Sequence, residues 1–496
     1  MSGSTVSSGP AGVSTRTLGL ALAAGGLLVV VDTTVAVVAL PAMVADLGSS
    51  LPALQWVSTG YLLGVVAVIP VAGWTADRFG ARGVYLAAVG FFTLASALVG
   101  LAWDVTSVIT SRVLQGLGGG LINPVGQAIA LRAVPRGARG RVMALLGLPV
   151  VIGPLLGPPL AGWLVDAASW RWVFWINVPV GLLAIVWCRR VLPRQQQQAR
   201  TPAPVDWLGL AMVSAGGGLL VLGCTLVGES AAITSPALAA AATGAVLLAG
   251  FVVRALRVPA PLLDLRLLRH RPLGVGLVVL ALFGAAYFGA LSVLPVFVQG
   301  VRGDSALLAG TLTLPMAVGV GLTLQVATRL VDRVPARRIV VTGLSIALAG
   351  AIALLVTTAA NSSYLLIAAA AALLGIGSGA TLMPTTTVAV RDLEDTDTPR
   401  GTTLLALVQQ LASALGAAAI TTTLTVLVAA RVPELATGPG GAGGGLSRML
   451  SLDPFERADL GSRPAQAVGG SYLLTIVLVL IALSVAVIGL RRSRAG

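Results

Sequence analysis

The sequence predicts an all-α, polytopic membrane protein with fourteen transmembrane helices. Of its 496 residues, 56% are hydrophobic and only 10% are charged, whereas a soluble protein typically carries about 25% charged residues. Apolar stretches of about 20 residues, long enough to span a hydrocarbon core as a helix, recur from one end of the chain to the other. The basic residues fall in short clusters between these stretches, as they do in the cytoplasmic loops of membrane proteins.

Fourteen apolar segments have the length of a transmembrane helix. The first is too long for the core of a signal peptide and lacks a clear cleavage site, so we expect it to be retained as a span. The cores lie at 18–44, 52–74, 84–102, 107–131, 141–165, 173–188, 207–227, 236–254, 274–299, 306–330, 338–360, 364–387, 402–430 and 471–490.

Arginine clusters set the orientation. They fall in every second loop and after the last span, while the alternate short loops hold almost only Arg171 and Arg302. Because basic residues favour the cytoplasmic side, we expect a multi-pass protein of the inner cell membrane with both termini in the cytoplasm. The clusters are Arg78 and Arg82; Arg132, Arg136, Arg139 and Arg141; Arg189, Arg190, Arg194 and Arg200; Arg254, Arg257, Arg266, Arg269 and Arg271; Arg333, Arg337 and Arg338; and Arg491, Arg492 and Arg494.

The composition argues against several function classes. The net charge is +14, but its distribution among loops argues against nucleic acid as a partner. The chain contains no Lys, so it has no phosphate-binding loop of the Walker type and we expect no nucleotide. His270 is the single His, which excludes a plausible zinc site. Cys188 and Cys224 fall toward opposite ends of their spans, so we expect no disulfide. With no catalytic constellation, we expect no enzyme activity and no cofactor.

Two parts of the sequence repeat one another. Residues Gly73–Arg82 (GWTADRFGAR) are similar to Thr328–Arg337 (TRLVDRVPAR), and Gly116–Gly120 (GLGGG) to Gly375–Gly379 (GIGSG), at nearly the same offset. We interpret spans 1–6 and 9–14 as two copies of a six-helix unit, the architecture of secondary transporters, with spans 7 and 8 inserted. The expected parts are an N-terminal bundle at 1–190, a cytoplasmic linker at 191–205, two inserted helices with a cytoplasmic loop at 206–271, and a C-terminal bundle at 272–496 with a long outer loop at 431–470.

Asp32 and Arg112 are the charged residues expected at mid-depth. At roughly 1.5 Å per helical residue, Asp32 lies about 15 Å from the outer end of span 1 and Arg112 about 10 Å into span 4. A charge at that depth costs about 2.5–3.5 kcal/mol on insertion scales. We therefore interpret Asp32 as a protonatable group facing a central cavity and Arg112 as its direct or water-bridged partner. The alternatives are a carboxylate fixed to a neighbouring helix and an arginine that snorkels to the outer interface.

Other polar side chains are candidates to line the cavity. Trp56 alternatively belongs to the interfacial aromatic belt. The candidates are Gln55, Trp56 and Tyr61 in span 2 and Asn123 and Gln127 in span 4.

Glycines mark two further regions. Gly73 and Gly80 allow a tight turn at the inner mouth, where Asp77 is expected either to cap a helix or to bind a charge of the other half. In span 5, prolines and small residues predict a helix that bends and packs closely, as a hinge or a seal. The residues of that segment are Gly147, Pro149, Gly153, Pro154, Gly157 and Pro158.

Several strings match the motifs of one family. They are Asp32-x-Thr34 with Ala39-Leu40-Pro41 in span 1, Gly73 with Asp77-Arg78-x-Gly80-x-Arg82 after span 2, Arg112-x-x-Gln115-Gly116 in span 4, Gly153-Pro154-x-x-Gly157 in span 5, and Trp170–Gly181 (WRWVFWINVPVG) before span 6. By these motifs the chain resembles the major facilitator superfamily over nearly its whole length. Within it, the chain resembles the fourteen-helix drug:proton antiporters of the QacA/EmrB type. It departs from their pattern at Val37, where Asn is usual, and at Pro158, where a second Gly is common.

The resemblance implies the major facilitator fold and a function. That function is proton-coupled antiport, which expels small cationic or amphipathic drugs or toxic compounds across the plasma membrane and confers antibiotic resistance. Asp32, Thr34, Arg112 and Gln115 would form the coupling and substrate site, and the loop around Asp77 an inner gate. The implied partners are a small-molecule substrate, protons and the lipid bilayer, and the protein is expected to act as a monomer. An importer, or an exporter of a secondary metabolite, peptide or lipid, is the alternative on the same fold.

The arginine clusters generate a topology prediction. Reporter fusions after residue 200 and after the C-terminus are expected to be active in the cytoplasm, and a fusion near residue 440 outside it, because basic loops are retained on the cytoplasmic side. The measurement is paired alkaline phosphatase and fluorescent protein activity at each site. A C-terminal fusion that reports the outside would contradict fourteen spans.

Overall fold

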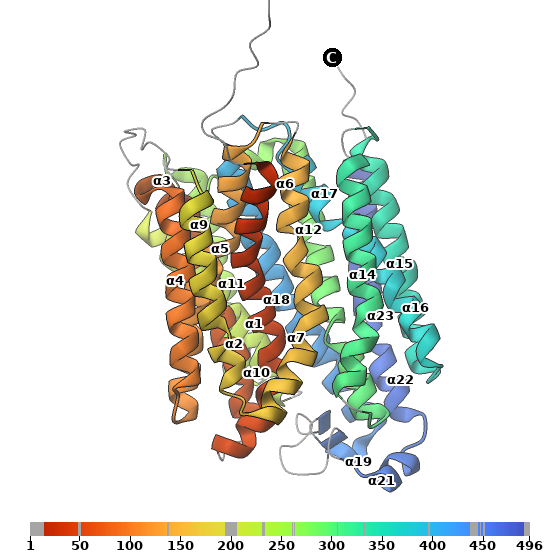
Figure 1. Ribbon diagram of the computed structural model, residues 1–496. Helices are drawn as coiled ribbons and strands as arrows, with labels where there is room; N and C mark the ends of the chain where they lie inside the picture. The colour runs from red at the N-terminus through yellow and green to blue at the C-terminus, as the bar shows by residue number, and fades with distance from the viewer. Residues whose placement is uncertain are drawn as a thin grey trace, which may run out of the picture.

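The computed structural model is helical throughout the residues that it describes (Figure 1). These are residues 14–47, 51–135, 138–193, 206–230, 234–259, 261, 263–304, 306–330, 333–394, 397–436, 445–446, 448–449 and 452–490. Most of the predicted linker and Asp332 of the second repeat lie outside them, as do the side chains of Val37, Gln55, Pro154 and Pro158.

The helices fall into two halves and an inserted pair. The N-terminal half comprises α1 (Thr15–Leu47), α2 (Leu51–Val68), η1 (Ile69–Val71), α3 (Ala72–Phe79), α4 (Ala81–Gly100), α5 (Val105–Ala133), α6 (Arg139–Leu146), α7 (Leu148–Ala167), α8 (Trp172–Trp175) and α9 (Asn177–Val191). The inserted pair is α10 (Trp207–Ser230) and α11 (Ser235–Arg257), followed by η3 (Leu265–Arg269). The C-terminal half comprises α12 (Arg271–Ala290), α13 (Val293–Val296), the π-helix η4 (Phe297–Val301), α14 (Ala306–Leu330), α15 (Ala336–Ala359), α16 (Tyr364–Gly379), α17 (Leu382–Ala389), α18 (Thr398–Arg431), α19 (Pro433–Ala436), α21 (Pro454–Asp459), α22 (Arg463–Gly470) and α23 (Tyr472–Gly489).

Twelve helical segments among the described residues are long and apolar enough to cross a membrane, which makes this a multi-pass membrane protein. Helices α5, of 29 residues, and α7, of 20 residues, are not among the twelve. Both were counted in the predicted fourteen spans, and α5 carries several polar residues that are also site candidates. The helical membrane fold is therefore established, while the number fourteen stays a prediction.

The helices run between two ends of the bundle (Figure 1). Helix α1 begins and α23 ends at one of them, which we call the terminal end, where α3, α6 and α17 also lie. Helices α19, α21 and α22 lie at the opposite end, which we call the loop end. The predicted outer loop at 431–470 thus contains these three short helices, and α22 leads directly into α23.

The two halves meet at few helices. Helix α7 packs against α14, and α18 packs against α2, η1 and α3. Leu404 and Leu407 of α18 belong to the hydrophobic core of the N-terminal half, which also holds Val65 and Ile69. Since α18 begins at the terminal end, this contact joins the halves there. Helix α10 packs against both α2 and α18, so the inserted pair covers one side of the seam.

One acid fixes the inserted pair. Asp206 precedes α10, and its Oδ1 atom accepts hydrogen bonds from Gly209 N and from Arg254 Nε of α11, each at 2.8 Å. Because a carboxylate at a helix N-terminus satisfies an otherwise unpaired N–H group, Asp206 caps α10 as its position suggests and also ties it to α11.

The repeated glycines make equivalent contacts in both halves. An added Cβ at Gly116 of α5 would overlap the carbonyl oxygen of Tyr61 in α2, and one at Gly375 of α16 would overlap that of Met316 in α14. A Cβ at Gly118 would likewise press on the backbone of α4, and one at Gly377 on the backbone of α15. Helices that touch this closely need small residues at the contact. The sequence repeat is therefore a repeat of helix packing.

Replacing Gly116 by Ala tests this packing. We expect the variant to lose stability by about 1–3 kcal/mol, because the Cβ atom can be accommodated only if α2 and α5 move apart. The measurement is the thermal unfolding of the detergent-solubilised protein. Gly83→Ala is the control, since a Cβ there meets no atom within 4 Å. Equal unfolding temperatures of the two variants would contradict the close approach.

Candidate functional site

Asp32 of α1 is buried at the centre of a hydrogen-bond cluster. Its side chain is 0% exposed, and its two oxygen atoms take different partners. Oδ2 accepts from Arg112 Nη1 at 2.5 Å, while Oδ1 accepts from Gln115 Nε2 at 2.8 Å and from Asn177 Nδ2 at 2.9 Å. The prediction of a carboxylate that faces an open cavity is therefore wrong for this conformation. The carboxylate is enclosed because helices α5 and α9 supply donors to both of its oxygens.

Arg112 of α5 is also buried, with a side chain that is 1% exposed. Its Nε atom donates to the carbonyl of Val57 at 3.1 Å, and its Nη1 atom also donates to Gln115 Oε1 at 2.8 Å. The guanidinium lies 4.5 Å from the ring centroid of Tyr61. Arg112 therefore does not snorkel to the interface, and it forms the direct pair with Asp32. Its hydrogen bonds offset the several kcal/mol that burying each ion costs.

Asn177 and Ser96 complete the cluster, although neither was predicted from the sequence as a site residue. Asn177 begins α9, is 2% exposed, and also donates through Nδ2 to Ser96 Oγ at 3.0 Å. Ser96 of α4 is 0% exposed and donates to the carbonyl of Phe174 at 2.9 Å. Asn177 lies in the Trp170–Gly181 string that supported the family resemblance. The signal in the sequence that could have identified Asn177 is an Asn at the start of an otherwise apolar helix.

The glycines of α7 bring that helix against α1 near the cluster. An added Cβ at Gly153 would overlap Val30, and one at Gly157 would overlap the hydroxyl of Thr34. Thr34 Oγ1 donates to the carbonyl of Val31 at 2.8 Å, within its own helix. Thr34 therefore takes part in helix packing and is not a member of the Asp32 cluster. The helix of span 5 is interrupted at Gly147, between α6 and α7.

The predicted cavity residues occupy several environments. Tyr61 is 3% exposed and packs on Arg112, so it belongs to the cluster rather than to a cavity wall. Trp56 and Gln127 are partly buried, and Asn123 is exposed and lies next to Gly26 of α1. The side chain of Gln55 lies outside the described residues.

The glycine-flanked motif forms a turn at the terminal end, between α3 and α4. Gly80 adopts φ +85°, a conformation that glycine adopts without strain. Asp77 Oδ1 accepts from Arg132 Nη2 of α5 at 2.8 Å. This partner is a residue of the same half, so Asp77 does not bind a described charge of the C-terminal half. Asp77 does not cap the following helix either, because the N-cap of α4 is Gly80 and has no side-chain hydrogen bond. Gly73 faces α18, with Thr403 Oγ1 3.4 Å from where its Cβ would lie.

The two basic residues of this motif contact neighbouring side chains and backbone. Arg78 lies over the rings of Trp74 and Phe79, at 5.8 Å from each centroid. Arg82 donates through Nη2 to the carbonyl of Arg189 at the end of α9. The motif therefore joins α3, α4, α5 and α9 at the terminal end.

An ion pair at the loop end holds the far end of α1. Asp46 Oδ2 accepts from Trp170 Nε1 at 2.9 Å and from Arg171 Nη1 at 2.5 Å. The hydrogen bond from Trp170, followed by that from Arg171, lowers the pKa of Asp46 from its ordinary value. Arg171 also donates to the carbonyl of Ala102 at 3.1 Å, so the end of α1 and two loops meet at this pair.

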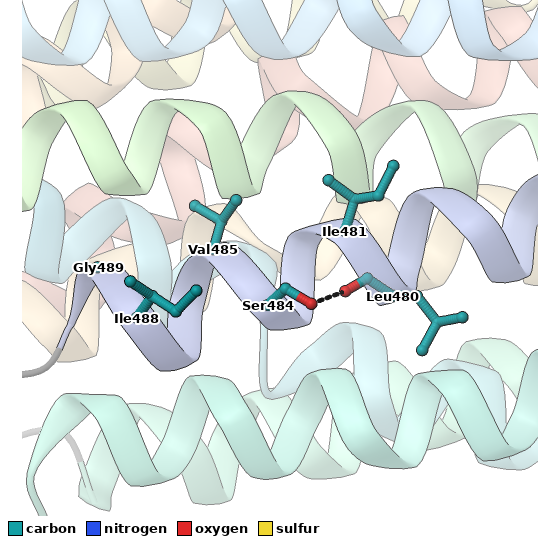
Figure 2. Close-up of a pocket in the computed structure, with 6 residues that line it drawn as sticks. All are labelled: Leu480, Ile481, Ser484, Val485, Ile488 and Gly489. Atoms are coloured by element: carbon teal, nitrogen blue, oxygen red, sulfur yellow. Dashed lines mark hydrogen bonds between the residues drawn. The ribbon is translucent and has the colours of Figure 1, made fainter.

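Figure 2 shows a groove on α23, a helix that packs on α12 and α15 and lies apart from the Asp32 cluster. Its volume is about 400 Å³, and its one polar side chain, Ser484, donates to the carbonyl of Leu480 at 2.9 Å. Several lining side chains are exposed and apolar, as on a face that contacts lipid. The groove is lined by Leu480, Ile481, Ser484, Val485, Ile488 and Gly489.

Among the described residues of the whole protein, no three His, Cys, Asp or Glu side chains are placed to hold a metal ion.

Known proteins resemble this chain in sequence. It is 35% identical over 416 residues to the "Multidrug resistance protein B homolog" of Mycobacterium tuberculosis, which covers 83% of this chain and 76% of that protein. It is 33% identical over 401 residues to the "Putative multidrug resistance protein MdtD" of Salmonella heidelberg, which covers 80% of this chain and 83% of that protein.

Solved structures resemble it in fold. The human organic anion transporter MFSD10 superposes with a TM-score of 0.62 at 16% identity, covering 95% of this chain and 100% of that one. The proton:xylose symporter XylE superposes with a TM-score of 0.59 at 14% identity, covering 94% and 95%. At these identities the likeness concerns the fold alone. The sequence itself matches the Major Facilitator Superfamily over residues 22–417, and the chain belongs to that family.

Proposed function

We propose that the protein is a proton-coupled antiporter that expels small cationic or amphipathic compounds across the plasma membrane. It would act as a monomer of the fourteen-helix QacA/EmrB type, with its terminal end in the cytoplasm. The observation that carries this proposal is the buried Asp32–Arg112 pair, because an intramembrane acid with a basic partner marks a proton or ion pathway.

Asp32 is suited to carry the proton. In the sequence of the C-terminal half, the acids fall in loops rather than deep in apolar runs. A carboxylate with an arginine partner can exist in two states, ionised and paired or protonated and released, and a cationic substrate competes with the proton for the ionised form. Such competition at one group is what an exchange of proton for cation requires.

Three observations support export of drugs in particular. The curated relatives carry names of multidrug resistance proteins, and both are at least 33% identical to this chain. The close contact of α7 with α1 at Gly153 and Gly157 coincides with the antiporter motif. The arginine-rich loops favour the cytoplasmic side for the terminal end, where the halves are joined through Leu404 and Leu407.

Substitution of Asp32 tests the coupling. Asp32→Asn is expected to reduce proton-driven export to that of vesicles without the protein, because an amide cannot bind and release a proton. Asp32→Glu is expected to retain part of it, since the charge survives and moves by one methylene. The assay follows matched mono- and dicationic dyes in proteoliposomes with an imposed pH gradient. Asp459→Asn, an exposed acid of α21, is the control.

Each outcome of that assay has a defined meaning. Full activity of Asp32→Asn would show that coupling lies at another acid. A preference for neutral or anionic cargo would contradict the cationic substrate class and favour a metabolite or lipid exporter. Dye export that survives collapse of the proton gradient would contradict antiport itself.

Substitution of Asp77 tests the terminal-end motif. Its pair with Arg132 is exposed and such pairs contribute about 0–1 kcal/mol, so Asp77→Asn should leave thermal stability nearly unchanged. We expect it to slow transport more than it weakens dye binding, because the residue is remote from Asp32. Asp397→Asn, which breaks the exposed pair with Arg400, is the control. An unchanged transport rate at normal expression would remove Asp77 from the mechanism.

A further inference from the structure

A chain of three hydrogen bonds runs from a backbone carbonyl to the carboxylate of Asp32. The carbonyl of Phe174 accepts from Ser96 Oγ at 2.9 Å, Ser96 Oγ accepts from Asn177 Nδ2 at 3.0 Å, and the same Nδ2 donates to Asp32 Oδ1 at 2.9 Å. All three side chains are at most 2% exposed. The chain connects α8, α4, α9 and α1.

The direction of this chain is fixed by chemistry. A carbonyl oxygen can only accept, so the single hydroxyl hydrogen of Ser96 is committed to Phe174. Ser96 Oγ must then accept from Asn177, and an amide nitrogen has two hydrogens to donate. One goes to Ser96 and the other to Asp32. A flipped amide would instead set its oxygen against both Ser96 Oγ and the carboxylate, so Asn177 is held as a donor.

We propose that Asn177, oriented by Ser96, is a positioning residue that directs the transported proton to Oδ2 of Asp32. This inference rests on the proposed role of Asp32 as the proton carrier. Oδ1 is occupied by two N–H donors, from Asn177 and Gln115, whereas Oδ2 has the single donor Arg112. The new O–H bond therefore forms on Oδ2. The carboxylate loses its charge, and Arg112 keeps its own protons.

Proton uptake at Oδ2 has a consequence for Arg112. Protonation removes the negative charge that the guanidinium faces at 2.5 Å, so the ion pair is lost and only a hydrogen bond to a neutral acid remains. Arg112 keeps its bonds to the carbonyl of Val57 and to Gln115 Oε1. When Asp32 is protonated, Asn177 Nδ2 can still donate to Oδ1, and this bond keeps α1 in place against α9. The ion pair between α1 and α5 is thus made and broken by one proton, while Gln115 still joins the two helices through Oδ1.

Few other titratable groups face Asp32. Arg112 of α5 and Tyr61 of α2 are the charged or titratable side chains beside it. Helix α9 carries Cys188, Arg189 and Arg190 at its other end, where Cys188 donates to the carbonyl of Ala21. Helix α6 carries Arg139 and Arg141 at the terminal end. Helix α7 carries Asp166 near its end, and the side chain of Asp166 lies outside the described ones; the described side chains of α7 and α8 include no titratable group.

The test is a direct titration of Asp32 in the purified full-length protein. Infrared spectroscopy in liposomes of neutral lipid follows the carboxylic acid C=O band that Asp32→Asn removes. In Asn177→Ala the midpoint of this band is expected about one pH unit higher than in the unsubstituted protein, the equivalent of one hydrogen bond to a charged group. Ser96→Ala is expected to shift it in the same direction by less, because Asn177 still reaches Asp32. The double variant should match Asn177→Ala alone.

Thr93→Ala is the matched control. Thr93 lies on the same α4–α9 contact, where it touches Gly181, but its hydroxyl donates to Val89 of its own helix. In Thr93→Ala the titration midpoint of the Asp32 band should equal that of the unsubstituted protein. A merely structural role of Asn177 would lower thermal stability in these variants without moving the midpoint.

Three results would overturn the proposal. They are an unchanged midpoint in Asn177→Ala, additive shifts in the double variant, and the absence of any titrating band that Asp32→Asn removes. If Asn177→Ala does not fold, the comparison of Ser96→Ala with Thr93→Ala is the test: a midpoint that shifts in the first and not in the second supports the proposal, and equal midpoints contradict it. The titration needs no cargo. Failure of dye export would therefore contradict the proposed function, and an unmoved midpoint with intact export would contradict the role of Asn177 alone.

Discussion

The buried ion pair between Asp32 and Arg112 is the constraint on which the N-terminal half is built. Each ion costs several kcal/mol to remove from water, and the attraction between them offsets this only when the remaining hydrogen-bonding groups are satisfied. The pair therefore needs donors and acceptors from neighbouring helices. Gln115, Asn177 and the carbonyl of Val57 provide them, and α1, α2, α5 and α9 must meet at one level.

The two halves share the same close helix packing but not the same buried charged residues. Gly116 and Gly375 bring corresponding helices into backbone contact, so the packing of the repeat is conserved within the chain. Four residues before Gly116 stands Arg112, whereas four residues before Gly375 stands Ala371, which is equally buried. An apolar residue there needs no partner. The buried ion pair is therefore a feature of the N-terminal half that its counterpart position in the C-terminal half lacks.

Contacts at both ends of the bundle connect the Asp32–Arg112 pair to the rest of the fold. Asp46 fixes the loop end of α1 to Trp170 and Arg171, only a few residues before Asn177 begins α9. At the terminal end, α18 packs on α2 and η1. Under the proposed mechanism, a shift of α1 relative to α5 would reach the seam between the halves through these contacts. Rigid rocking of repeats around a central site is how such transporters alternate access.

The sequence alone was sufficient for the membrane class, the repeated glycine motifs and the choice of Asp32 and Arg112 as partners, because hydropathy, glycine spacing and charge are read from single helices. Three features depended on how the helices pack. Asn177 reaches Asp32 across 145 positions of sequence, Asp77 pairs within its own half, and Thr34 turns toward α7. Each depends on the rotation of one helix against another. That rotation is set by close packing at glycines and by the need to satisfy buried polar groups, and neither is a property of one segment.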